Sequence, residues 1–366
     1  MSTSALASSI EYLMECNSGC VRLHAARSLG CPRRFGPLQN LREDAEKDMF
    51  ARDVRELFLV SYAQALRTGR LRGRASGVLG RVLSSNASVA IDALLARGCF
   101  EPSKALEFVL DEILSRAHRR GFFYEPYQER EARTRSQASE RCFVHATAVC
   151  ARYLLAFGRG RDPRVRAAFD WLVEMQGADG TWRAPRGASC EDRTESYVLT
   201  RAVAQAFAEL PIATARRYNA TRDHLAAGWS DRVLVRCESP DAVMTELNIA
   251  PDPRDPADGP LVPQALEDRI LYFPLEDLWL ALAVGASPDH PHLAPWVQWL
   301  EDTQLADGSW RLQNPGLRER LLLSDPNGRL RAEALYLTDE WITLRGAQIL
   351  YFVGKWRARA PEKIPA

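Results

Sequence analysis

Carboxylates and one histidine stand at the starts of four apolar segments that have helical spacing. These residues are His145 in the first segment, Glu191, Asp192 and Glu195 in the second, Glu276 and Asp277 in the third, and Asp339 and Glu340 in the fourth. A carboxyl group in an apolar pocket beside other carboxyls has a raised pKa, because desolvation and like charge both disfavour its ionised form. Such a group can donate a proton near neutral pH, so the pattern predicts a general acid–base site. Its candidate acids are His145, Glu191, Asp192, Glu195 and Asp339.

Aromatic residues lie within two positions of three of these acidic clusters. The residues that we expect to bind substrate are Tyr197, Glu276, Asp277, Trp279, Glu340 and Trp341. The rings among them can stabilise a cationic intermediate through their faces. Asp and Glu also favour helix N-termini, where they cap free N–H groups and face the positive end of the helix dipole. Each carboxylate therefore has an alternative, structural interpretation, and His145 has one as a core histidine.

Helices are the elements that must position these side chains. Apolar residues recur at helical spacing in segments 45–67, 103–119, 142–157, 163–176, 192–209, 276–285, 291–304 and 338–357. Strand alternation is nearly absent, and Gly and Pro cluster between the helical segments. The charged run 128–141 and the Pro-rich segment 251–263 are typical of loop insertions. The pattern predicts an all-α protein.

Two segments of the chain are near-copies of each other. Residues 168–182 read AFDWLVEMQGADGTW, and residues 296–310 read WVQWLEDTQLADGSW. In each copy a helix ends at the Gln, Gly180 or Gly308 supplies a positive φ in a tight turn, and the closing Trp packs back on that turn. Such a turn joins the two helices of a stacked helical hairpin. Weaker copies at 106–124, 225–229 and 10–20 predict roughly five to seven hairpins.

These Gln-x-x-x-Gly-x-Trp turns resemble the QW motifs of squalene-hopene cyclases, class II terpene cyclases and prenyltransferase β subunits. The resemblance implies an α/α toroid, an α6–α6 barrel built from helical hairpin repeats. It implies one domain over residues 1–366, in which residues 1–44 form an atypical N-terminal repeat or cap. The inner helices would line an apolar cavity for an isoprenoid or a similar chain.

The catalytic signatures of these families are missing from the chain. Class II cyclases carry Asp-x-Asp-Asp followed by Thr-Ala, whereas this chain reads Phe143-Val144-His145-Ala146 followed by Thr147-Ala148. The chain has no Asp-x-Cys zinc motif, no Cys-His pair and no Asp-Asp-x-x-Asp diphosphate motif. The resemblance thus implies a terpene-cyclase-like enzyme that cyclises or rearranges an isoprenoid or polyene-like substrate without the usual acid motif.

Two other functions fit the same pattern. Carboxylate pairs at a defined separation also hydrolyse or eliminate at glycosidic bonds, and aromatic rings stack on sugars, so an α/α-barrel hydrolase or lyase is one alternative. A toroid that lost its site and only binds a ligand is the other. We expect no cofactor for any of these functions, apart from Mg²⁺ if the substrate is a diphosphate.

Composition limits the partners. The net charge of +1 gives no reason to expect a nucleic acid, and the chain lacks a run of 18 apolar residues that could span a membrane. The eight cysteines show no framework spacing, and the N-terminal residues lack the pattern of a signal peptide. We therefore expect a cytoplasmic protein whose partner is a small hydrophobic substrate. The sequence makes no prediction of oligomeric state.

Overall fold

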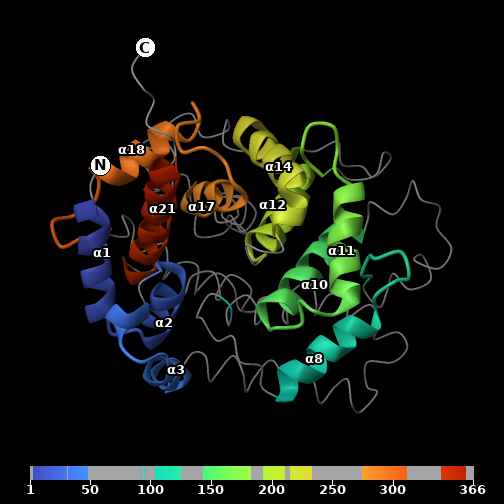
Figure 1. The fold of residues 1–366 in the computed structure, drawn as a ribbon, viewed down its shortest axis with the longest axis horizontal. Coiled ribbons are helices and arrows are strands. Elements are labelled where there is room, and N and C mark those ends of the chain that lie inside the picture. Colours follow the sequence, from blue (N-terminus) through green and yellow to red (C-terminus); the bar gives the residue numbers. More distant parts are fainter. Residues whose placement is uncertain are drawn as a thin grey trace, which may run out of the picture. The chain divides into compact units, whose positions relative to one another are not determined.

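The computed structural model describes residues 3–30, 32–47, 91, 95, 104–124, 143–182, 193–210, 215–232, 274–310 and 339–359. The regular structure of this part of the chain is helical, and its one antiparallel bridge, Ala117 with Phe123, belongs to no strand (Figure 1). The all-α prediction is confirmed. Contacts divide the chain into two compact units. Unit 1 comprises Met1–Asp48 and Ser230–Ala366, and unit 2 comprises Met49–Trp229.

Four helices of unit 2 match predicted segments closely. They are α8 (Lys104–Ser115), α10 (Val144–Ala156), α11 (Pro163–Glu174) and α12 (Arg193–Ala208). The 3-10 turn η6 (Arg216–Tyr218) and helix α14 (Asn219–Arg232) follow where no helical segment was predicted. Helix α10 packs against α11 and α12. The core between them is aromatic: the rings of Phe122 and Phe143 stack at 4.6 Å between centroids, and Trp171 contacts Phe122. These side chains are fully buried, as expected for the residues with the largest apolar area.

Unit 1 brings together helices from distant parts of the sequence. They are α1 (Thr3–Glu15), α2 (Gly19–Ser28), the 3-10 turn η1 (Pro32–Phe35), α3 (Leu38–Lys47), α17 (Pro274–Val284), α18 (Ala294–Asp302) and α21 (Asp339–Arg359). Helices α1, α2 and α17 all contact α21, and α3 packs on α2. Figure 1 shows α1 in blue beside α21 in red. None of the helices described in either unit is long and apolar enough to cross a membrane.

The predicted copy at residues 225–229 is wrong, because these residues lie inside α14. Gly228 serves close packing there and not a turn: a Cβ at this position would meet the backbone of Asp179 and Gly180. In the segment 10–20, Gly19 starts α2, so α1 and α2 are joined without a glycine turn. The predicted helix 45–67 is described only at residues 45–47, which end α3, and both loop insertions lie outside the described residues.

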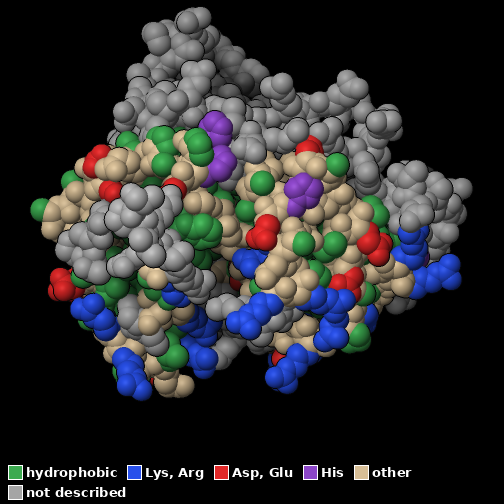
Figure 2. Space-filling model, turned by 45° about the horizontal axis from the view of Figure 1, so that its top comes forward, with side chains coloured by type: hydrophobic (Ala, Val, Ile, Leu, Met, Phe, Trp, Pro, Cys, Tyr) green, Lys and Arg blue, Asp and Glu red, His purple; other side chains and the backbone are tan. Residues whose placement is uncertain are grey.

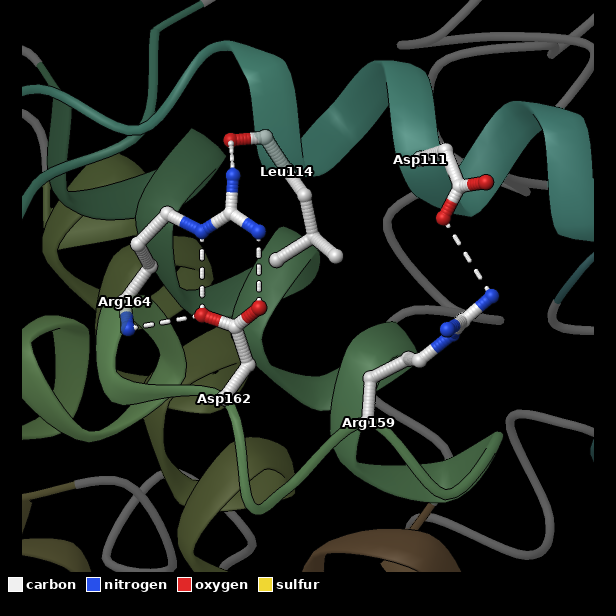
Figure 3. Close-up of polar contacts among 5 residues, drawn as sticks. All are labelled: Asp111, Leu114, Arg159, Asp162 and Arg164. Atoms are coloured by element: carbon white, nitrogen blue, oxygen red, sulfur yellow. Dashed lines mark hydrogen bonds and ion pairs between the residues drawn. The ribbon is translucent and has the colours of Figure 1, made fainter.

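Polar side chains fix the start of α11 against the end of α8 (Figure 3). The Asp162 carboxylate accepts hydrogen bonds from the backbone N–H of Arg164 and from its guanidinium, at 2.7 to 2.9 Å. Arg164 Nη1 also donates to the carbonyl oxygen of Leu114, in the last turn of α8, at 3.0 Å. Asp162 thus caps α11 and orients the arginine that satisfies α8. Arg159 adds a peripheral ion pair with Asp111 at 3.2 Å.

Replacing Asp162 should show how much this cap contributes. We expect Asp162→Ala to lower the free energy of unfolding by about 1 kcal/mol, because the N-cap and the anchor of Arg164 are both lost. The Arg164 guanidinium lowers the pKa of Asp162, so its contribution is complete above the unfolded pKa, about 3.9. The contribution disappears as pH falls through the lower folded-state value. Urea titrations of wild type and variant at pH 7 and pH 3 measure this, and an equal difference at both pH values would contradict it.

Candidate functional site

Three turns in the two units share one backbone geometry. Their glycines, Gly121, Gly180 and Gly308, have φ values of 100°, 78° and 84°, which confirms the positive φ predicted for Gly180 and Gly308. In each turn the glycine N–H donates to the carbonyl of the residue three positions before it, at 2.9 to 3.0 Å. The turn at 117–123 was expected as a weaker copy, and its bonding matches that of the other two. Ala117 stands there where the other turns have Gln176 and Gln304.

Four residue types in the turns of the two strong copies each make a hydrogen bond. Gln176 Nε2 donates to the carbonyl of Gly180 at 3.1 Å, and Gln304 Nε2 donates to that of Gly308 at 3.0 Å. Asp179 accepts hydrogen bonds from the backbone N–H and the hydroxyl of Thr181, and Asp307 accepts the same two bonds from Ser309. The indole N–H of Trp182 donates to the Leu172 carbonyl at 2.8 Å, and that of Trp310 donates to the Leu300 carbonyl at 2.9 Å. The closing Trp therefore ties the turn to the helix before it.

A threonine in the helix after each turn completes the geometry. The hydroxyl oxygens of Thr147, Thr200 and Thr343 accept from the backbone N–H of Phe123, Trp182 and Trp310, at 3.0 to 3.1 Å. The same hydroxyls donate to the carbonyls of those aromatic residues at 3.4 to 3.5 Å. These threonines are fully buried. Each threonine therefore fixes its own helix, α10, α12 or α21, in the same position relative to the turn before it.

The common register puts polar residues at equivalent positions of the three helices. Five residues after each threonine stand Arg152, Gln205 and Gln348. Arg152 and Gln205 lie on the packed pair α10 and α12, where Nη1 and Oε1 are 3.5 Å apart. Gln348 is buried in unit 1, and its Nε2 donates to Ser28 Oγ at 2.9 Å. The position is thus polar in all three helices.

Arg345 is the centre of a buried group of polar and aromatic side chains in unit 1. Its Nε donates to Glu276 Oε1 at 2.7 Å, and its Nη1 donates to Gln348 Oε1. The guanidinium carbon lies 4.1 Å from the centre of the Trp279 ring and 5.7 Å from that of Trp341. The arginine side chain keeps 9% of its surface exposed and Glu276 keeps 20%. Arg345, Glu276, Gln348, Trp279, Trp341, His24 and Ser28 are named the Arg345 cluster below.

His24 contributes a neutral imidazole to this cluster. Its ring lies edge-on to Trp341, 5.9 Å between centroids. Burial lowers the pKa of His24 to about 3, and the positive charges of Arg345 and Arg27 act in the same direction. The imidazole therefore carries no charge at physiological pH and is suited to hydrogen bonding rather than to ion pairing. In the same unit, burial raises the pKa of the Cys16 thiol to about 11, so that this cysteine stays protonated and unreactive.

The structure brings together only part of the predicted site. Glu276, Trp279 and Trp341 meet in the Arg345 cluster, where the guanidinium occupies ring faces that were predicted to meet a cationic intermediate. Asp277, the residue after Glu276 in α17, is 4% exposed. Asp339 and Glu340 form the partly exposed first turn of α21.

The other predicted residues lie elsewhere or outside the described part. His145 is in the first turn of α10, with an exposed side chain, and so is no core histidine. Glu191 and Asp192 lie outside the described residues. Glu195 and Tyr197 belong to α12, but their side chains also lie outside the described part. Sequence reasoning missed Arg345, Gln348 and His24, although a charged residue within the apolar run 341–350 was a usable signal.

The described residues offer no ready metal site. No group of three or more His, Cys, Asp or Glu side chains among them is close enough to hold an ion. His290 and His292 stand in the surface turn before α18, with 5.5 Å between ring centroids, and the His292 backbone N–H donates to His290 Nδ1. Figure 2 shows histidine side chains exposed on one face, and Lys and Arg side chains gathered along its edge.

No family model matches the chain, and no curated protein matches it in sequence. The function must therefore be inferred from the repeated turns and from the Arg345 cluster.

Proposed function

We propose that the chain is an α/α toroid enzyme of the terpene-cyclase kind, which cyclises or rearranges an isoprenoid or polyene-like substrate. The observation that carries the proposal is the bonding of the Gln-Trp turns. The same glutamine, aspartate, tryptophan and threonine contacts recur at residues 176–182 with Thr200 and at residues 304–310 with Thr343. This set of contacts explains why the QW letters occur together, so it supports a common architecture with the families that the motif resembles.

Contact between the two ends of the chain is the second support. Gly180 meets the backbone of α14 at His224, and Gly308 meets the backbone of α1 at Ser8 in the same way. Within unit 1, the last described turn therefore rests on the first helix of the chain, as an earlier turn in unit 2 rests on α14. The proposed toroid requires such a contact between its terminal repeats.

Asp277, which the sequence placed among the substrate-binding residues, is the most buried of the described carboxylates of the predicted site, and we assign it the role of the acid. It lies at the start of α17, next in sequence to Glu276. In the proposed reaction this acid protonates a substrate double bond, and a second double bond attacks the resulting cation. Proton loss to water or to a carboxylate ends the reaction. Asp339, Glu191, Asp192, Glu195 and His145 are the alternative acids.

Product analysis tests the proposal. Purified protein is incubated with farnesyl diphosphate, geranylgeranyl diphosphate, squalene and prenylated aromatics, with and without Mg²⁺, and extracts are analysed by gas chromatography and mass spectrometry. We expect a new product from at least one substrate. Asp277→Asn should lower its rate by about 100-fold or more if Asp277 is the acid, since a positioned acid contributes about 10²–10⁴. The control Asp302→Asn changes an exposed carboxylate on α18 and should leave the rate unchanged.

A non-catalytic binding protein is the second candidate, favoured by the same cluster. Arg345 fills the space between Trp279 and Trp341 and neutralises Glu276, which leaves these groups fewer free contacts for a reacting substrate. This reading predicts saturable quenching of tryptophan fluorescence by a polyprenyl ligand, with no product from any substrate. Turnover would exclude this candidate. A result that shows no turnover and no quenching would exclude both candidates.

A further inference from the structure

One end of the Arg345 guanidinium is left open. Its Nε donates to Glu276 and its Nη1 donates to Gln348, whereas Nη2, which carries two N–H groups, donates to no residue in the described part of the chain. Nη2 is not enclosed, so the 9% of the side chain that stays exposed includes this nitrogen. A guanidinium that is nine-tenths buried thus keeps two donors available to a ligand.

The other contacts of Arg345 hold this open end in place. The guanidinium carbon lies 4.1 Å from the centre of the Trp279 ring and 5.7 Å from that of Trp341. Gln348, which accepts from Nη1, is itself fixed by its bond to Ser28 at 2.9 Å. Donors that are ordered before a ligand arrives cost less entropy on binding.

The repeated architecture does not require an arginine at this position. Arg345 stands two residues after Thr343, and the residues two positions after Thr147 and Thr200 are Val149 and Ala202. A further two positions along, by contrast, all three helices have a fully buried alanine: Ala151, Ala204 and Ala347. A buried charge where the two other helices are apolar indicates a role beyond packing.

An entirely apolar ligand fits the open end poorly. A hydrocarbon that covered Nη2 would take two N–H groups of a cation out of water without offering them an acceptor, which carries the full desolvation cost of a charged donor. The ligand group that meets Nη2 therefore has to contain an acceptor, such as oxygen.

The charges around Arg345 favour a neutral acceptor over an anion. Glu276 already balances the guanidinium, and His24 carries no charge at physiological pH. On α2, Arg22 is bound to Asp44 of α3 at 3.0 Å, and Arg27 is exposed to solvent.

The carboxylates near this group strengthen that preference. Helix α17 and the first turn of α21 add three carboxylates and no cation: Asp277, Asp339 and Glu340. A diphosphate would meet one arginine that is already paired, together with the repulsion of these carboxylates. A hydroxyl or carbonyl oxygen accepts the same hydrogen bonds without that repulsion.

We propose that Arg345 binds a neutral oxygen, in a hydroxyl or carbonyl group, of a ligand whose apolar chain packs on the half-buried ring of Trp279. This ligand names a substrate class for the proposed function, on which the inference rests: an oxygenated isoprenoid or polyene without a phosphate group. Glu276 and Gln348 are positioning residues, since they act by holding the guanidinium.

Ligands that share one chain and differ at one end test the proposal. Isothermal titration calorimetry on the full-length protein compares geranylgeraniol, geranylgeranyl diphosphate and the hydrocarbon of the same chain. We expect the alcohol to bind at least about tenfold more tightly than either of the others, which is the effect of a hydrogen bond to a charged donor. Equal binding of alcohol and hydrocarbon, tighter binding of the diphosphate, or no binding of the alcohol would overturn the proposal.

These outcomes are independent of turnover. Preferred binding of the alcohol without any product would support the ligand class and count against the proposed chemistry. A product formed from a ligand whose oxygen adds no affinity would support the chemistry and reject the role of Arg345.

The variant Glu276→Gln supplies a measurement that does not depend on a loss of binding. It keeps Arg345 but removes the charge that balances it, so the carboxylate geranylgeranoate should bind about fivefold more tightly than to wild type. The affinity for geranylgeraniol should change by less than about twofold, because the alcohol is uncharged. The control Glu11→Gln changes an exposed carboxylate of the same unit and should alter neither affinity. An unchanged affinity for the carboxylate in Glu276→Gln, with the fold confirmed by circular dichroism, would contradict the charge balance that selects a neutral ligand.

Discussion

Gly180→Ala should unfold unit 2 or lower its free energy of unfolding by about 3 kcal/mol or more. Two costs act at this position. Its φ of 78° is strained for any residue with a Cβ, and the added carbon would overlap the His224 carbonyl oxygen in the backbone of α14. Backbone cannot move aside as a flexible side chain does, so the turn and α14 must separate. Urea unfolding followed by circular dichroism, together with exchange of the α14 amides, measures the loss.

Gly158→Ala is the matched control for this change. Gly158 ends α10 with a φ of 82°, nearly that of Gly180, but a Cβ there would meet nothing within 4 Å. The control therefore carries only the conformational cost, about 1 kcal/mol. The difference between the two variants isolates the close approach of turn and helix. Equal effects would show that the packing of the turn against α14 does not constrain Gly180.

Arg345→Met should destabilise unit 1 by about 3 kcal/mol. The change keeps an apolar stem against Trp279 but leaves the Glu276 carboxylate without its guanidinium. Removing one partner of a buried ion pair costs about 3–5 kcal/mol, and the lower end applies because Glu276 keeps 20% of its side chain exposed. The double variant Glu276→Gln with Arg345→Met should recover most of the loss, since no charge is then left buried. The four proteins form a double-mutant cycle, read by urea unfolding.

A surface pair provides the comparison for that cycle. Arg34 and Glu11 are also linked, at 3.8 Å, but their side chains are 48% and 67% exposed. Arg34→Met should change the free energy of unfolding by less than about 0.5 kcal/mol, because solvent screens exposed pairs. If Arg345→Met cost no more than Arg34→Met, the Arg345 cluster would not be a stabilising element. Ligand binding by the Arg345→Met protein should be assayed at low temperature, where the variant stays folded.

The repeat turns were predictable because their chemistry is local. Gln, Asp, Gly and Trp lie within seven residues, and most of their hydrogen bonds stay inside the turn or reach the helix before it. The copy at Phe123 lacks both Gln and Trp, yet the sequence still showed its helix, glycine and aromatic residue. Residues 225–229 misled the prediction because a glycine before a tryptophan serves equally well where a helix packs closely on a neighbouring backbone.

The site was less predictable because its contacts join distant segments. Arg345 meets Glu276 of α17, 69 residues earlier in the chain, and Gln348 meets Ser28 of α2, 320 residues earlier. The acidic residues at helix starts were visible in the sequence, but their partners were not. Glu276 therefore looked like a free carboxylate, whereas the structure pairs it with an arginine that lies against two indoles.

The threonine contacts also bear on how such a chain changes in length. Thr147, Thr200 and Thr343 bind only backbone groups of the preceding aromatic residue, so each works whatever helical pair stands on either side. A duplication or deletion that begins at one turn glycine and ends at the next, such as Gly121 to Gly180, would restore a complete turn at its boundary. Genetic insertions in this architecture should accordingly be tolerated in whole helical pairs, which makes the stretch between two glycines the natural module for designing larger or smaller versions.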